Sequence, residues 1–123
     1  MKIHTLFSLL LSLMILSCNT PTVIGVHIRV ENVSTFDYDN IVINTSVEDQ
    51  DYGPILSNEI SDYFEFEEAY SYAYVRITTN GNVYTLQPID YVGESKLEDG
   101  FYRYEIGLDD LNNENISIEL KEE

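Results

Sequence analysis

His27 is the one histidine outside the apolar N-terminal segment, so any histidine-based chemistry in the folded chain depends on it. A hydrolytic triad needs a histidine beside a nucleophile and a carboxylate, and the sequence has no nucleophile elbow or related motif. Zinc is disfavoured as well, because the chain offers one such histidine and a single cysteine. We therefore expect His27 to lie on the solvent face of a strand, and the protein to be no enzyme and to need no cofactor.

Carboxylates are abundant, but their spacing does not indicate a specific catalytic or metal site. Adjacent acids such as Glu67 and Glu68 resemble a glycosidase pair only in type, and a solvated charge run explains them better. The segment EDQDYG (48–53) offers oxygen ligands at alternating positions, which makes Asp49 and Asp51 weak calcium candidates. It lacks the distal glutamate of an EF-hand loop, so no metal is assigned.

Aromatic and polar side chains around one predicted hairpin form the best candidate binding surface. Asn80-Gly81 separates two alternating runs, 70–78 and 82–87, and this dipeptide favours a type I′ turn. The resulting register pairs Ile77 with Tyr84 and sorts the flanking side chains onto two faces. One face is core, and the other is a stripe that suits a sugar or a protein partner. The stripe consists of Tyr72, Tyr74, Arg76 and Gln87. The alternative is that these rings simply cover a twisted sheet.

The N-terminal segment ends at the only cysteine of the chain. Residues 6–16 form an apolar stretch that is too short for a membrane-spanning helix of about 20 residues, and Lys2 precedes it. This arrangement is typical of a secretory signal peptide. The tetrapeptide Ile-Leu-Ser-Cys at 15–18 resembles a bacterial lipobox, which implies cleavage before Cys18 and acylation of its thiol. The predicted organisation is a signal peptide (1–17), a lipidated tether (18–25) and one domain (26–123).

The tether has two consequences for location. The seven residues between Cys18 and Val26 span at most about 25 Å, so the domain is expected close to the bilayer. Residue 19 is Asn, and no acidic cluster follows the cysteine. These features favour the outer membrane, lipid-anchored, with the periplasmic face preferred over the cell surface.

Net charge excludes some partners. Of the six basic residues only Lys2 precedes Cys18, so five face 22 acidic residues in the remaining chain, a formal charge of −17. Such a charge repels nucleic acid and anionic lipid surfaces. Ten tyrosines and many β-branched residues exclude disorder and favour strands.

Alternation and turn signals predict an all-β chain of about seven short strands. We expect strands at 26–31, 40–44, 60–66, 70–78, 82–87, 101–108 and 116–120, with a turn at 48–53 and an irregular segment or short edge strand at 54–58. Strands at this spacing indicate an antiparallel sandwich or a small barrel. Residues 88–96 are expected to form a connection, because proline donates no ladder hydrogen bond.

One local pattern favours a sandwich. The segment 98–104 resembles the tyrosine corner of immunoglobulin-like domains, in which Tyr102 bonds the backbone of the preceding turn. Tyr104 then takes the position where antibody domains place a cysteine. We expect an immunoglobulin-like or transthyretin-like sandwich without a disulfide.

With YAYV at 72–75, PIDYVGE at 88–94 and the segment 97–106, the chain resembles a set of small Bacteroidota lipoproteins that carry an all-β domain. The resemblance spans most of residues 26–106 and is strongest from 69 to 106. The resemblance implies origin and envelope location, and it carries no catalytic residue. We expect a non-enzymatic, membrane-anchored binding or accessory module for an envelope protein or glycan. The alternatives are a structural subunit of an envelope complex and a calcium-binding module.

Overall fold

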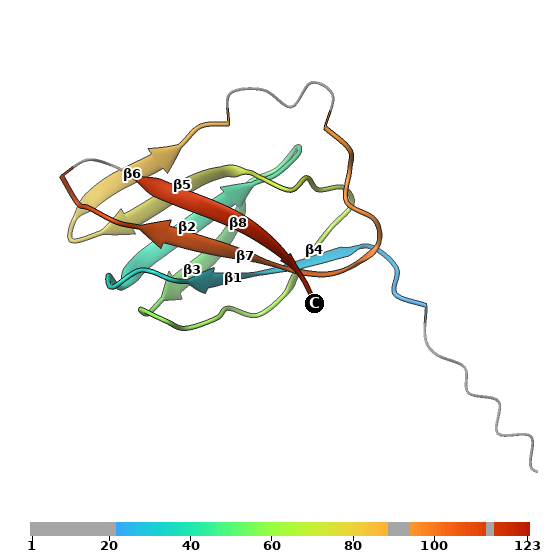
Figure 1. Cartoon of the computed structure of the whole chain (residues 1–123), viewed down its shortest axis with the longest axis horizontal. Coiled ribbons are helices and arrows are strands. Elements are labelled where there is room, and N and C mark those ends of the chain that lie inside the picture. Colours follow the sequence, from blue (N-terminus) through green and yellow to red (C-terminus); the bar gives the residue numbers. More distant parts are fainter. Residues whose placement is uncertain (1–21, 89–93, 113–114) are drawn as a thin grey trace, which may run out of the picture.

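Eight strands form two four-stranded sheets that pack face to face (Figure 1). The computed structural model describes residues 22–88, 94–112 and 115–123, and these ranges contain no helix. The strands are β1 (Val26–Asn32), β2 (Tyr38–Asn44), β3 (Gln50–Ile55), β4 (Phe64–Phe66), β5 (Tyr74–Thr79), β6 (Asn82–Leu86), β7 (Gly100–Leu108) and β8 (Ile116–Glu122). The predicted all-β sandwich is confirmed, with one strand more than expected.

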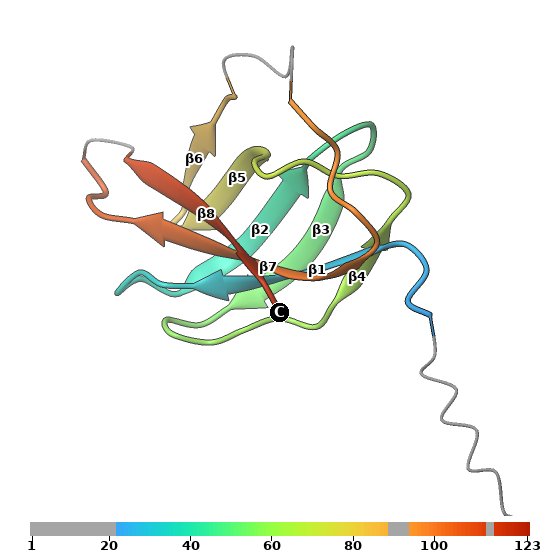
Figure 2. The ribbon, with the colours of Figure 1, turned by 45° about the vertical axis from the view of Figure 1, so that its right-hand side comes forward.

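The first sheet contains one parallel pair of strands, whereas the second sheet is antiparallel throughout (Figure 2). The first sheet has the order β4-β1-β7-β8, and the second has the order β3-β2-β5-β6. Every pairing is antiparallel except that of β1 with β7, which is parallel from Val26↔Gly100 to Asn32↔Ile106. This parallel pair places the first strand beside the seventh, and β8 then continues the sheet on the far side of β7.

The hairpin of β5 and β6 has the predicted register. Thr79 pairs with Asn82, Ile77 with Tyr84 and Val75 with Leu86. Asn80 and Gly81 have φ angles of 50° and 74°, as a type I′ turn requires. Ala73, Val75, Ile77 and Tyr84 are buried, and Leu86 packs against the core.

The turn predicted at 48–53 is wrong, because β3 begins at Gln50 and continues through Pro54 to Ile55. Burial outweighs the polar turn signal here: Tyr52 and Ile55 are 8% and 3% exposed. Gly53 has a φ of 70°, and the β2–β3 register shifts beside it, so the strand contains a bulge. Pro54 is tolerated because β3 is an edge strand. A short edge strand was one of the two expectations for residues 54–58.

The strand predicted at 60–66 is also too long. Only Phe64–Phe66 form β4, and Ile60 makes an isolated bridge to Glu31. The Ser61 hydroxyl accepts the Val30 N–H at 2.9 Å, and this side-chain bond replaces a regular ladder step. Phe64 and Phe66 pack against the core as expected.

Five tyrosines lie in the core, and the hydroxyl of each donates to a backbone carbonyl. The donor–acceptor pairs are Tyr38–Ile106 at 2.9 Å, Tyr52–Ile28 at 2.9 Å, Tyr84–Leu111 at 3.0 Å, Tyr102–Glu98 at 2.8 Å, and Tyr104–Tyr70. The bonds of Tyr38 and Tyr52 run from the second sheet to the first. Because the single cysteine precedes the domain, these bonds and the apolar core join the sheets without a disulfide.

Candidate functional site

The aromatic stripe lies on the outer face of the second sheet. On β5, Tyr74 pairs with Asn44, and Arg76 lies between Val42 of β2 and Thr85 of β6. Tyr72 precedes β5, and Gln87 follows β6. Tyr72, Tyr74 and Arg76 are half-buried, and Gln87 is exposed. The register thus places Tyr74 and Arg76 on one face, as the sequence predicts.

Val42 shows that this outer face is covered by side chains. Its neighbours Ile41 and Ile43 pair with core residues of β5, so Val42 itself points outward beside Arg76. It is nevertheless only 3% exposed. Arg76, the cross-strand partner of Val42, therefore lies beside an apolar side chain that the protein covers, while Tyr72, Tyr74 and Arg76 each keep part of their surface in solvent.

A second aromatic group, which the sequence did not indicate, lies on the outer face of the first sheet. The His27 ring stacks on Phe101 with centroids 4.8 Å apart, and Tyr63 meets Phe101 edge-on at 5.1 Å. The Arg29 guanidinium lies 4.9 Å from the Tyr63 ring centroid. These residues come from β1, from the segment before β4, and from β7. His27 is half-buried rather than freely exposed, because the parallel β1–β7 pairing places Phe101 directly beside it.

Ion pairs occupy the rest of that face. Arg29 Nε donates to Glu123 Oε1 at 2.7 Å, and this bond holds the Glu123 pKa below its usual value and raises that of Arg29. Arg103 lies between Glu31, at 3.1 Å from Nε, and Glu105, at 3.2 Å from Nη2. The Nε contact is an ion pair without hydrogen-bond geometry. Both arginines of this face are thus paired with carboxylates of the same chain.

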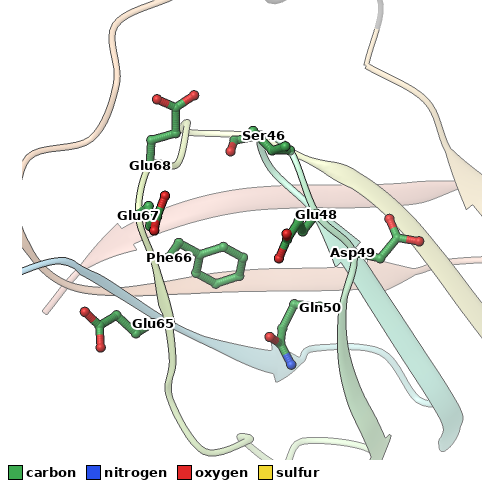
Figure 3. A pocket seen from close by; sticks show the side chains of 9 residues that line it. Ser46, Glu48, Asp49, Gln50, Glu65, Phe66, Glu67 and Glu68 are labelled. Atoms are coloured by element: carbon green, nitrogen blue, oxygen red, sulfur yellow. The ribbon is translucent and has the colours of Figure 1, made fainter.

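An acidic cleft of about 400 Å³ opens between the ends of β3 and β4. Its lining includes Phe66 and five carboxylates: Glu48, Asp49, Glu65, Glu67 and Glu68. Figure 3 shows the Phe66 ring in the middle, with Glu48 and Glu67 near it, whereas the carboxylates of Asp49, Glu65 and Glu68 point away. Lys96 pairs with Glu68 at 2.6 Å. The acids do not converge on one point, so the cleft lacks the geometry of a cation site.

The two calcium candidates make local bonds. Asp51 Oδ1 accepts the Gly53 N–H at 2.8 Å, and Asp49 Oδ1 accepts from Asn44 Nδ2 at 3.0 Å. Within the described ranges, no group of three or more His, Cys, Asp or Glu side chains is placed to hold a metal ion. The Asp51 side chain stabilises the bulge of β3 at Gly53. This hydrogen bond explains an aspartate at position 51 without a bound metal.

Two predictions from the sequence fall on residues outside the described ranges. Cys18 and the signal peptide precede residue 22, and most of PIDYVGE lies within 89–93. In the part of the chain that the structure describes, no helix is long and apolar enough to span a membrane. The tyrosine corner, by contrast, is confirmed: the Tyr102 hydroxyl donates to the Glu98 carbonyl at 2.8 Å.

Comparison with known proteins identifies the fold and nothing finer. No family model and no curated protein matches the sequence. An NMR structure of a protein from Eubacterium rectale resembles this chain with a TM-score of 0.54 and 21% sequence identity. The similarity covers 80% of this chain and 90% of that one. At this identity the match supports the sandwich architecture alone.

Proposed function

We propose that the chain is a non-enzymatic envelope lipoprotein, anchored through Cys18, whose β-sandwich binds an envelope protein or glycan through the stripe. The supporting observation is the placement of Tyr74 and Arg76 on one outer face of β5, half-exposed, with Gln87 directly after β6, the strand that pairs with β5. Tyrosine and arginine are the residues that contribute most to binding surfaces, because each combines a large apolar area with directional hydrogen bonds.

Anchoring follows from the lipobox resemblance at 15–18. Two or three acyl chains on Cys18 hold a protein firmly, whereas a single chain binds only marginally. The Cys18→Ser variant should appear in the soluble fraction after cell lysis, and the wild type in the outer-membrane fraction. A variant that remains in the membrane fraction would refute lipid anchoring.

Binding through the stripe is tested by removing its rings. We expect the Tyr72→Ala/Tyr74→Ala variant to lose retention of outer-membrane glycan or cross-linking to an envelope protein, with the thermal midpoint little changed. Val83→Ala is the matched control: Val83 lies on the same face near the turn, is 54% exposed, and is outside the stripe. Equal binding by both variants would contradict the proposal, and unfolding of the double variant would assign the rings to sheet coverage instead.

A structural subunit is the second candidate function. The outer face of the first sheet favours it, since its two arginines are already paired with carboxylates within the chain. A stoichiometric partner that salt does not remove, and that both Tyr72→Ala/Tyr74→Ala and Val83→Ala retain, would support a structural subunit over ligand binding through the stripe.

A further inference from the structure

Exposed apolar side chains gather where the described chain begins. Val23 and Ile24 are 37% and 76% exposed, and Phe101 is 38% exposed. His27 Nε2 lies 3.0 Å from the Ile24 carbonyl, to which it donates, and the His27 ring stacks on Phe101. Tyr63 also contacts Phe101, so the three rings form one group, and the bond from His27 to the Ile24 carbonyl ties the exposed segment of Val23 and Ile24 to it. Glu65, the cross-strand partner of His27, borders this surface. We name it the tether-side patch: Val23, Ile24, His27, Tyr63 and Phe101.

The patch lies at one end of the sandwich. The first residues of β1 and β7 pair there, and the chain enters beside β4 (Figures 1 and 2). The β5–β6 turn at Asn80-Gly81 lies at the opposite end (Figure 1). The patch is therefore the apolar surface nearest to Cys18 along the chain.

We propose that the tether-side patch rests on the phospholipid surface that holds acylated Cys18. This rests on the anchoring proposed above. Four residues, 19–22, separate Cys18 from Val23, so the two are at most about 18 Å apart at about 3.5 Å per residue. With so short a tether, the end that carries Val23 and Ile24 cannot leave the headgroup region by more than this distance.

The chemistry of the patch matches that region. Aromatic rings with a polar group are enriched at membrane–water interfaces, because one edge is apolar and the other hydrated. Tyr63 and His27 have this character, and Ile24, Val23 and Phe101 supply aliphatic and aromatic area to bury. The domain is strongly acidic, so the surface it fits is zwitterionic phospholipid rather than anionic lipid.

A tryptophan reporter tests the contact, because the native chain has no tryptophan. Phe101→Trp and, as matched control, Val83→Trp are prepared in the lipidated chain and reconstituted into phosphatidylethanolamine–phosphatidylcholine vesicles. We expect the reporter at 101 to emit at shorter wavelength, to be quenched by brominated lipid, and to be quenched by acrylamide several-fold less than the reporter at 83. Replacing part of the lipid by phosphatidylglycerol should reduce that protection.

The outcomes separate the two proposals. If the lipidated chain does not sediment with vesicles, anchoring fails. If it sediments but the reporters at 101 and 83 are quenched equally by acrylamide and neither by brominated lipid, the tether-side patch does not touch the bilayer. Protection that appears only with added envelope glycan or protein would also overturn the lipid contact. Ile24→Trp serves as a second reporter at a site where exposure makes misfolding no concern.

Discussion

Tyrosines of the two faces of the sheets have different roles in this protein. Between the sheets, Tyr38, Tyr52 and Tyr104 are buried, and each hydroxyl bonds a carbonyl that lies far away in the sequence. On the outer face of the second sheet, Tyr74 is half-exposed, as is Tyr72 just before β5. The residue type is the same, but the inner set joins the two sheets, and the outer set keeps part of its surface in solvent. Composition alone therefore does not separate core tyrosines from surface tyrosines, whereas register does.

Among substitutions at neutral pH, Tyr104→Phe should have the largest effect on stability. Tyr104 is fully buried, and its hydroxyl lies 2.9 Å from Thr45 Oγ1 and also donates to the Tyr70 carbonyl. Leaving these buried partners short of a hydrogen bond should cost about 1–3 kcal/mol, or at least about 4 °C in midpoint. Tyr74→Phe is the control, with no change beyond about 0.5 kcal/mol. If urea unfolding shows the same loss of unfolding free energy for Tyr104→Phe and Tyr74→Phe, the distinction between inner and outer tyrosines is wrong.

Alkaline pH should destabilise the fold through the inner tyrosines. Burial raises the pKa of Tyr38 to about 12, and burial also raises the pKa of Tyr52. The unfolded state loses these protons near pH 10, whereas the folded state keeps them. The contribution of these tyrosines to the free energy of unfolding is therefore fully present below pH 10 and decreases as the pH rises above it. The expected loss is about 1.4 kcal/mol per pH unit for each such group. Urea titrations between pH 9 and about 12 measure this, and Tyr38→Phe should reduce the slope; an unchanged slope would refute this assignment.

Acid should have a smaller effect at the outer face of the first sheet. The Arg29 hydrogen bond lowers the Glu123 pKa, so the pair stabilises the fold above the ordinary glutamate pKa and the contribution is lost as pH falls below it. Because both side chains are partly exposed, Glu123→Gln should cost under about 1 kcal/mol at neutral pH. Urea unfolding at pH 7 and pH 3 should show the wild type and variant converging at the lower value. A difference that persists in acid would exclude this ion pair as the cause.

Calcium should have the smallest effect. Asp49 and Asp51 are engaged in local hydrogen bonds and do not converge with other acids. A specific site would stabilise the fold by about 2.7 kcal/mol at a calcium concentration one hundred times its Kd. We expect millimolar calcium to leave the thermal midpoint unchanged, apart from a screening effect that magnesium reproduces. A saturable shift with calcium alone would restore the calcium-binding alternative.

Local signals predicted much of the fold. Asn80-Gly81 gave the correct turn and register because φ above zero at two successive residues suits few other dipeptides. The alternation of β7 placed Tyr102 and Tyr104 inward, and the corner contact of Tyr102 followed from the turn before it. These features depend on neighbours within a few residues, which a sequence shows directly.

Features that depend on distant pairing were not predictable. The polar segment at 48–53 suggests a turn, but Tyr52 finds the Ile28 carbonyl across the core, and this tertiary bond favours a strand. The contact of His27 with Phe101 requires the parallel β1–β7 pair, for which the sequence has no local signal. The shared face of Tyr74 and Arg76 could be predicted because both lie within one hairpin, whereas the group of His27, Tyr63 and Phe101 could not, because it draws on three segments.

A crosswise comparison of two variants tests the division between inner and outer tyrosines most directly. Tyr104→Phe and Tyr72→Ala/Tyr74→Ala are each assayed for thermal midpoint and for retention of envelope ligand well below that midpoint. We predict that Tyr104→Phe lowers the midpoint and keeps binding, and that the double variant keeps the midpoint and loses binding. If both variants lose both properties together, the outer rings belong to the fold and the stripe is not a binding surface.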